Sequence, residues 1–160
     1  MRPTRSCEVF IDGASRGNPG PSGIGVVFKD GRGTTGQQLS RYIGETTNNV
    51  AEYLALIYAL QQALRDGYTA LTVHTDSELL ARQVNGQYKV RDSQLRLFHG
   101  LALELVKGFA QCSIDHIPRT RNAAADRLAG AAVRNHQKKI TGVMTRIVKA
   151  EFADQSESRF

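Results

Sequence analysis

The sequence predicts a single α/β domain, in which a five-stranded mixed sheet carries helices on both faces. Two observations predict this fold. Three strand-like segments follow one another through short turns, and helical and strand-like segments then alternate, in the order β-β-β-α-β-α-α-β-α. With 160 residues, 41% of them hydrophobic, the chain is long enough for one domain with a sizeable core.

Three short strands open the predicted fold. They are expected at residues 6–13, 23–31 and 34–44. In the first strand, apolar side chains occupy every second position until Asp12, which gives the strand one charged end. The second strand closes in a turn at Asp30-Gly31, and the third is more polar. Consecutive strands joined by such short turns form an antiparallel meander.

The rest of the predicted fold contains four helices and two more strands. Apolar residues at helical spacing, with glycine or Asn-Gly at several ends, predict the helices, and short apolar runs predict the strands. The helices are expected at residues 46–67, 77–86, 92–109 and 122–136, and the strands at 70–77 and 112–118. Asn122 is expected to be the N-cap of the last helix.

The helical spacing fades after about residue 136. We therefore expect a domain at residues 1–136 and a basic C-terminal tail at residues 137–160. An added strand, a short helix and a loose tail are all compatible with this stretch, and a tail is the general expectation. Residues from 134 onward hold 6 basic and 3 acidic side chains, against 15 and 12 before them, so half of the net charge of +6 lies there.

The composition favours a soluble protein with a polyanionic partner. A pI of about 9.6 is compatible with nucleic-acid binding, although a soluble surface with a basic tail gives the same value. There is no apolar run long enough to span a membrane and no apolar signal core near the start, so we expect a cytoplasmic protein. Cys7 and Cys112 lie in apolar strand-like runs and are predicted to be buried thiols.

Four acidic residues fall at the ends of predicted elements. Asp12 ends the first strand, Glu52 lies early in the first helix, Asp76 ends the fourth strand and Asp126 lies in the first turn of the last helix. Each has a structural explanation alone, because acids are favourable at helix N-termini and in turns. Sites in such sheets form at the carboxyl ends of parallel strands. The four therefore meet if the first and fourth strands pair in parallel.

Such a cluster predicts a metal site. Four carboxylates in one place repel one another unless cations neutralise them, and hard oxygen ligands suit Mg²⁺ or Mn²⁺. Two such ions about 3.5–4 Å apart activate a water molecule and stabilise the leaving oxygen in phosphodiester cleavage. The pattern therefore predicts a site for two ions and a phosphodiester hydrolase.

Four sequence blocks resemble the motifs of type 1 ribonuclease H (ribonuclease HI). They are IDGASRGNPGPSGIG, TTNNVAEYLAL, HTDSELLARQVNG and HIPRTRNAAADRLA, and the resemblance covers roughly residues 6–135. The combination of D-G-x-x-x-x-N-P-G, T-N-N-x-x-E, T-D-S and A-D-x-L-A is specific, whereas any one block is weak evidence. The resemblance implies the ribonuclease H fold, whose second strand is antiparallel to its neighbours.

The resemblance also implies the activity. The family cleaves the RNA strand of RNA–DNA hybrids with Mg²⁺ or Mn²⁺ and leaves 5′-phosphate and 3′-hydroxyl ends. By position, Asp12, Glu52, Asp76 and Asp126 match its metal-binding carboxylates, with Asp12 expected to bridge both ions. His116 matches a histidine that in many relatives moves a proton or helps product release, although a histidine in a strand also has a purely structural explanation. We expect a monomer with no membrane partner.

The implied substrate contacts lie in the glycine-rich stretch after the first strand and at the start of the first helix. In the family this stretch contacts the 2′-hydroxyls that distinguish RNA from DNA. The matching positions are Gly13, Ser15, Asn18, Thr47, Asn48, Asn49 and Glu78, and Thr47 corresponds to a phosphate pocket for the DNA strand. A plain hairpin connection is the alternative explanation for the glycines.

The chain departs from well-known bacterial members in lacking their basic protrusion. The stretch NGQYKVRDSQ leads directly into the next helix, and the chain has no Trp. Affinity for the hybrid is then lower or comes from elsewhere, and cations of the tail are one candidate source. Two alternative functions are a related nuclease such as a resolvase and a non-catalytic hybrid-binding module. The T-N-N-x-x-E block argues against the first, and the complete set of carboxylates argues against the second.

Overall fold

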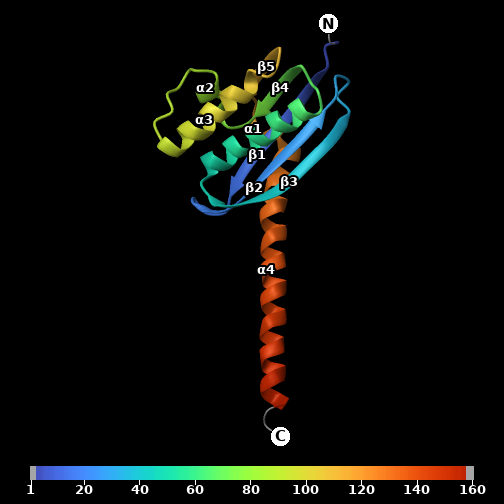
Figure 1. Cartoon of the computed structure of the whole chain (residues 1–160), viewed down its shortest axis with the longest axis vertical. Helices are drawn as coiled ribbons and strands as arrows, with labels where there is room; N and C mark the ends of the chain where they lie inside the picture. The colour runs from blue at the N-terminus through green and yellow to red at the C-terminus, as the bar shows by residue number, and fades with distance from the viewer. Residues whose placement is uncertain (1–2, 158–160) are drawn as a thin grey trace.

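The computed structural model describes residues 3–157, with the surroundings of side chains up to residue 153. Its strands form one mixed sheet in the order β3-β2-β1-β4-β5 (Figure 1). β2 is antiparallel to β1 and β3, whereas β4 is parallel to β1 and β5 is parallel to β4. The strands are β1 (Ser6–Ser15), β2 (Gly20–Lys29), β3 (Thr35–Thr46), β4 (Ala70–Thr75) and β5 (Gln111–His116). The predicted five-stranded mixed sheet is confirmed.

The helices also follow the predicted order. They are α1 (Asn48–Arg65), α2 (Glu78–Val84), α3 (Ser93–Val106) and α4 (Ala123–Glu157), with a short 3₁₀ turn η1 (Arg119–Arg121) before α4. No helix among the described residues is long and apolar enough to cross a membrane.

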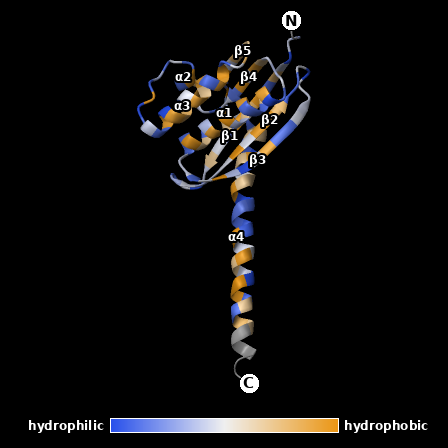
Figure 2. Cartoon of the chain, viewed as in Figure 1, coloured by the Kyte–Doolittle hydropathy of each residue, from blue (hydrophilic) through white to orange (hydrophobic). Residues whose placement is uncertain are grey.

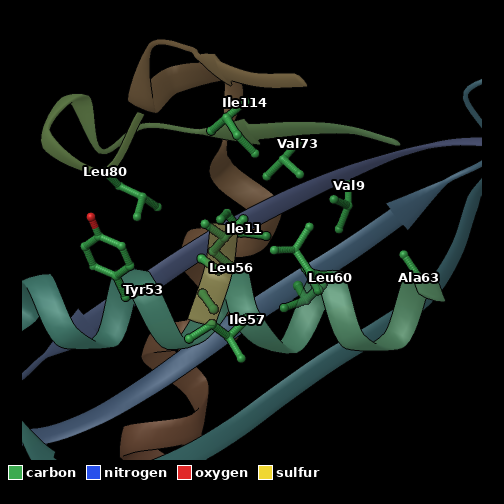
Figure 3. Packing of buried hydrophobic residues seen from close by; sticks show 14 of the residues in the cluster. Val9, Ile11, Tyr53, Leu56, Ile57, Leu60, Ala63, Val73, Leu80 and Ile114 are labelled. Carbon is green, nitrogen blue, oxygen red and sulfur yellow. The ribbon is translucent and has the colours of Figure 1, made fainter. Parts of the chain in front are cut away.

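The main core lies between the sheet and α1. Val9 and Ile11 of β1 are fully buried against Leu56 and Leu60 of α1, and Val73 of β4 joins them (Figure 3). The alternation that predicted the first strand therefore marks the face that α1 covers. Cys7 is buried in this core, as expected, whereas Cys112 is half-buried.

Helix α4 packs on the opposite face of the sheet through small residues. Its Ala125, Ala129 and Ala132 are buried, and a Cβ placed on Gly25 of β2 would lie 2.1 Å from the carbonyl oxygen of Ala125. Only glycine allows the helix backbone to approach the strand this closely. Gly23, two residues earlier in β2, meets the same helix in the same way. This close packing fixes the start of α4 beneath β1 and β2.

The sequence left a strand, a short helix and a loose tail open for residues 137–160, and the residues that the structure describes there, up to Glu157, are helical. Helix α4 continues without a break to Glu157, and its second half projects away from the domain (Figure 1). Apolar residues do recur at helical spacing in this stretch, at Ile140, Val143, Met144 and Ile147. Polar residues at 134–139 interrupt the pattern and hid it.

Candidate active site

The pairing of β1 with β4 brings two of the predicted acids together. In the parallel register Ile11 lies opposite Thr75, so Asp12 and Asp76 are the next residues on neighbouring strands. Asp12 is only 4% exposed, although it carries a carboxylate. A buried carboxylate in this position needs hydrogen bonds or a counter-charge.

Glu52 reaches the same place from the first turns of α1. Thr47 caps this helix, because its side chain accepts a hydrogen bond from the backbone N–H of Val50. The backbone N–H of Gly13 donates to Glu52 Oε2 at 3.1 Å. A Cβ on Gly13 would lie 2.4 Å from the backbone of Ala51, so this glycine is what lets β1 and α1 meet.

Three carboxylates thus form one cluster. One oxygen each of Asp12, Glu52 and Asp76 lie within 4.8 Å of one another. This spacing and the all-oxygen donor set suit a hard divalent cation. The acidic cluster predicted from the sequence is therefore present for these three residues.

The fourth acid, Asp126, approaches from α4. It lines the same cleft as the other three and hydrogen-bonds to the side chain of Asp12. Arg119 of η1 lies near it, with Nη2 3.4 Å from Asp126 Oδ1. Asp126 is not part of the tight group of three, which places it at the edge of the cluster.

Asn122 positions Asp126, a role that the sequence analysis did not find. The side-chain amide of Asn122 is buried and donates from Nδ2 to the carbonyl of Ile11 at 2.8 Å. It thereby ties the start of α4 to the residue before Asp12. The expected capping hydrogen bond is absent, since Oδ1 of Asn122 has no partner among the described residues. The capping pattern gave the right position in the chain but the wrong contact.

Replacing Asn122 by alanine should lower both stability and turnover. Removing a buried hydrogen bond costs about 1–3 kcal/mol, and the carbonyl of Ile11 would lose its partner. We expect kcat to fall several-fold with little change in KM, because the start of α4 loosens while the loop after β1 keeps its position. Thermal unfolding and steady-state kinetics test this, with Asn135→Ala on the exposed face of α4 as control. An unchanged unfolding temperature would contradict the assigned role.

The cluster is electrostatically strained without cations. Burial, the nearby charge of Asp76 and the hydrogen bond with Asp126 raise the pKa of Asp12 to about 8. Burial and the charge of Asp12 raise the pKa of Glu52 well above its ordinary value. A bound cation would favour the charged forms of these carboxyl groups and so relieve the repulsion between them.

The acids line a polar cleft that also contains part of the predicted substrate-binding set. The cleft has a volume of about 390 Å³. Besides the four acids it is lined by Gly13, Ala14, Ser15, Asn48, Ser77 and Arg119. Three of the predicted contact residues, Gly13, Ser15 and Asn48, therefore lie beside the acids.

The other predicted site residues lie around the cleft or outside it. Asn18 accepts a hydrogen bond from the backbone N–H of Asn48, at 3.0 Å, and so links the loop after β1 to α1. Asn49 is exposed in the first turn of α1. Glu78 begins α2 and pairs with Arg82 at 2.8 Å. His116 ends β5 opposite Thr75, is exposed, and does not line the cleft.

Comparison with known proteins identifies the family. A family model described as reverse transcriptase-like matches residues 10–132. Ribonuclease HI of Halobacterium salinarum is 42% identical over 135 residues, which make up 83% of this chain and 68% of that protein. The chain belongs to the ribonuclease H family. A bifunctional protein of Mycobacterium tuberculosis is also 42% identical, and the chain covers 35% of its length.

Solved structures of the ribonuclease H family superpose on most of the chain. The crystal structure of RNase H1 from Halobacterium salinarum gives a TM-score of 0.80 at 41% identity, covering 81% of this chain and 98% of that one. LC11-RNase H1, solved in complex with an RNA/DNA hybrid, gives a TM-score of 0.78 at 41% identity, covering 82% of this chain and 99% of that one. The family resemblance of the four sequence blocks is confirmed.

Proposed function

We propose that this chain is a metal-dependent endoribonuclease that hydrolyses the RNA strand of RNA–DNA hybrids and leaves 5′-phosphate and 3′-hydroxyl ends. The observation that carries the proposal is the cluster of Asp12, Glu52 and Asp76, with Asp126 at its edge, in one polar cleft. The hybrid bound to LC11-RNase H1 supports the choice of substrate.

The four carboxylates hold the ions in this proposal. Asp12, Glu52 and Asp76 would hold metal at the centre of the cluster, and Asp126 would contribute from its edge. Bound Mg²⁺ or Mn²⁺ supplies an activated water and stabilises the leaving oxygen. The protein fixes the carboxylates: Gly13 orients Glu52 through its backbone N–H, and Asn122 anchors the helix of Asp126.

The loop after β1 and the start of α1 bind the hybrid beside the ions. Gly13, Ser15 and Asn48 present backbone and side-chain polar groups in the cleft, where the RNA strand would lie. By their match to the family, Asn18, Asn49 and Glu78 would contact the groove of the hybrid, and Thr47 would belong to a phosphate pocket for the DNA strand. Contacts to 2′-hydroxyls make the site selective for RNA.

His116 is assigned a supporting role at the edge of the site. His116 ends β5 and pairs with Thr75 of β4, the residue directly before Asp76. The exposed imidazole carries one ring nitrogen that can donate and one that can accept a hydrogen bond. In this proposal it assists proton transfer or product release, and its replacement by alanine reduces kcat by less than the roughly 100-fold typical of a direct general acid–base.

Incubation with a labelled hybrid tests the proposed function. The RNA strand should be cut only when Mg²⁺ or Mn²⁺ is present, while double-stranded RNA, double-stranded DNA and junction DNA stay intact. A protein that retards the hybrid on a gel but leaves the RNA whole with either ion would be a binding module. Cleavage of the junction would favour a resolvase. Either result would overturn the proposal.

The cations of the projecting half of α4 are proposed to contribute to hybrid binding. This part of the helix leaves the domain beside the loop after β1, where Arg16 hydrogen-bonds to Gln137. Replacing Lys138, Lys139, Arg146 and Lys149 together by glutamine should raise KM about 3- to 10-fold at low salt and leave kcat unchanged. The salt dependence of KM should flatten, since each lost phosphate contact lowers the slope by about 0.7–0.9.

Arg65→Gln is the matched control for this prediction. Arg65 ends α1, at the opposite end of that helix from Glu52, and should affect neither KM nor its salt dependence. If the quadruple variant has the same KM and salt slope as the unmodified chain, the projecting helix plays no part in hybrid binding.

A further inference from the structure

The projecting half of α4 carries an uncovered apolar surface. We call residues 138–157 the arm. Its large apolar side chains are 43–69% exposed. Hydrophobic residues recur along this part of the helix (Figure 2). They are Ile140, Val143, Met144, Ile147, Val148 and Phe152, of which the first five form the apolar stripe. The family match ends at residue 132, so the stripe lies outside the region that relates the chain to ribonuclease H.

The stripe continues the face of α4 that packs on the sheet. Val133 is buried against Gly23 of β2, and Ile140 and Ile147 follow it at intervals of seven residues. Seven residues are close to two helical turns, so the three side chains lie on one face. Before residue 137 the sheet covers this face of α4. In the arm, no described residue covers it (Figure 1). A contiguous exposed apolar surface of this kind marks an interaction site.

We propose that the apolar stripe is a self-association surface, on which the arm of a second copy of this chain packs in antiparallel orientation. The sequence led us to expect a monomer, but a monomer leaves the stripe in water. An isolated stretch of helix this short also gains little stability without packing.

The distribution of charge on the arm favours a second copy. Each copy has a net charge of +6, so pairing requires that the cations stay apart. At about 100° per residue, Lys138, Lys139, Arg146 and Lys149 all lie more than a quarter-turn from the centre of the stripe. Among the positions that border the stripe, Gln137, Thr141 and Ala150 are uncharged, and Glu151, which follows the stripe on the same face, is an anion rather than a cation. Two stripes therefore meet without facing cations, and the cations remain available to the hybrid.

The side of α4 on which the stripe lies determines how the two arms are oriented in the pair. In a parallel pair, the first half of the partner's α4 would have to occupy the space of β2 and β3, because the sheet lies on the same side of the helix as the stripe. In an antiparallel pair each arm ends beneath the other copy's domain. The arm is about 30 Å long at 1.5 Å per residue, which leaves room for this arrangement. The contact is isologous, with the same surface used by both copies.

The expected interface is small. Two helices of this length bury on the order of 1,000 Å² in total, at the low end of specific interfaces, so we expect weak association, in the micromolar range. Analytical ultracentrifugation of the full chain should show a shift from 17.6 kDa toward twice that mass with rising concentration. Ile147→Asp should weaken the association at least about tenfold.

Thr145→Asp is the matched control, because it adds the same charge to the same helix away from the stripe. It should leave the association unchanged. Helicity by circular dichroism and RNA cleavage by both variants show whether the arm and the domain remain folded. A chain that stays monomeric at about 100 µM, far above the expected range, would overturn the proposal. Binding of the stripe to lipid vesicles without self-association would overturn it as well.

Cysteine cross-linking tests the orientation. Antiparallel packing about the middle of the stripe, near Met144, places position 140 of one copy beside position 148 of the other. A mixture of the Ile140→Cys and Val148→Cys variants should then form a mixed disulfide in preference to disulfides within either variant. The unmodified chain, with Cys7 and Cys112, gives the background. Disulfides formed only between identical variants would indicate a parallel pair and contradict the proposed geometry.

Discussion

Replacing Asp12 by asparagine should abolish RNA cleavage, with a loss of about 1,000-fold or more in kcat, as expected for a central electrostatic group of a catalytic site. Asn keeps the shape of the side chain but removes the charge. Asp12 shares the cluster with Glu52 and Asp76 and hydrogen-bonds to Asp126, so its charge acts on every cation held there. Single-turnover cleavage of a labelled hybrid at saturating Mg²⁺ or Mn²⁺ measures the loss.

Asp66→Asn is the control for charge removal elsewhere. Asp66 follows α1 at the end remote from Glu52 and should keep full activity. Binding of the hybrid should persist in the Asp12 variant, because the loop after β1 and the start of α1 are unchanged. If the Asp12 variant kept more than a tenth of the activity, the central role of this carboxylate would be wrong.

The same variant should stabilise the protein when metal is absent. In the folded protein the pKa of Asp12 is raised to about 8, whereas the ordinary pKa of this side chain is 3.8. A raised pKa in the folded state means that stability is full below about pH 4 and is lost as the pH rises toward 8. Asn is neutral throughout and avoids this loss. The gain should therefore grow with pH between these limits, to the order of 1–3 kcal/mol, in thermal unfolding with a chelator.

Much of the fold and the meeting of the four acids in one cleft could be predicted because the signals are local or follow from topology. The change from alternation to helical spacing marks β1 and α1, and a parallel pairing of β1 with β4 suffices to bring Asp12 and Asp76 together. The sequence assigns Gly13 to the glycine-rich stretch that contacts the substrate. The structure gives another reason, the close approach of α1, which only the packed backbone reveals.

Other features could not be predicted, since they depend on contacts between distant parts of the chain. Asn122 and Ile11 are 111 residues apart, and nothing in the local sequence distinguishes an asparagine that caps a helix from one that anchors it to a strand. The arm shows the opposite problem. Its apolar spacing is visible in the sequence, but without a partner for these residues inside the domain the sequence alone leaves a strand, a short helix and a loose tail open.

Replacing Gly25 by alanine should strongly destabilise the protein. The added Cβ would lie 2.1 Å from the carbonyl oxygen of Ala125 and 2.8 Å from the backbone nitrogen of Ala129. Both are backbone atoms of a long helix, so α4 itself must move. We expect a cost of about 3 kcal/mol or more, since overpacking against rigid atoms is at the upper end of its usual range. For a chain of this size that lowers the unfolding temperature by about 6–12 °C.

The same change should reduce activity through Asp126, because a displaced α4 carries both Asp126 and its anchor Asn122 away from β1. We expect kcat to fall at least about tenfold while the hybrid still binds to the loop after β1. Gly36→Ala in β3 is the matched control, since its nearest atom is the carbonyl oxygen of Phe28 at 3.7 Å, an ordinary contact. The free energy of unfolding of that variant should lie within about 0.5 kcal/mol of that of the unmodified chain. If the two glycine variants had equal stability and activity, close packing of α4 on β2 would not be what positions the fourth carboxylate.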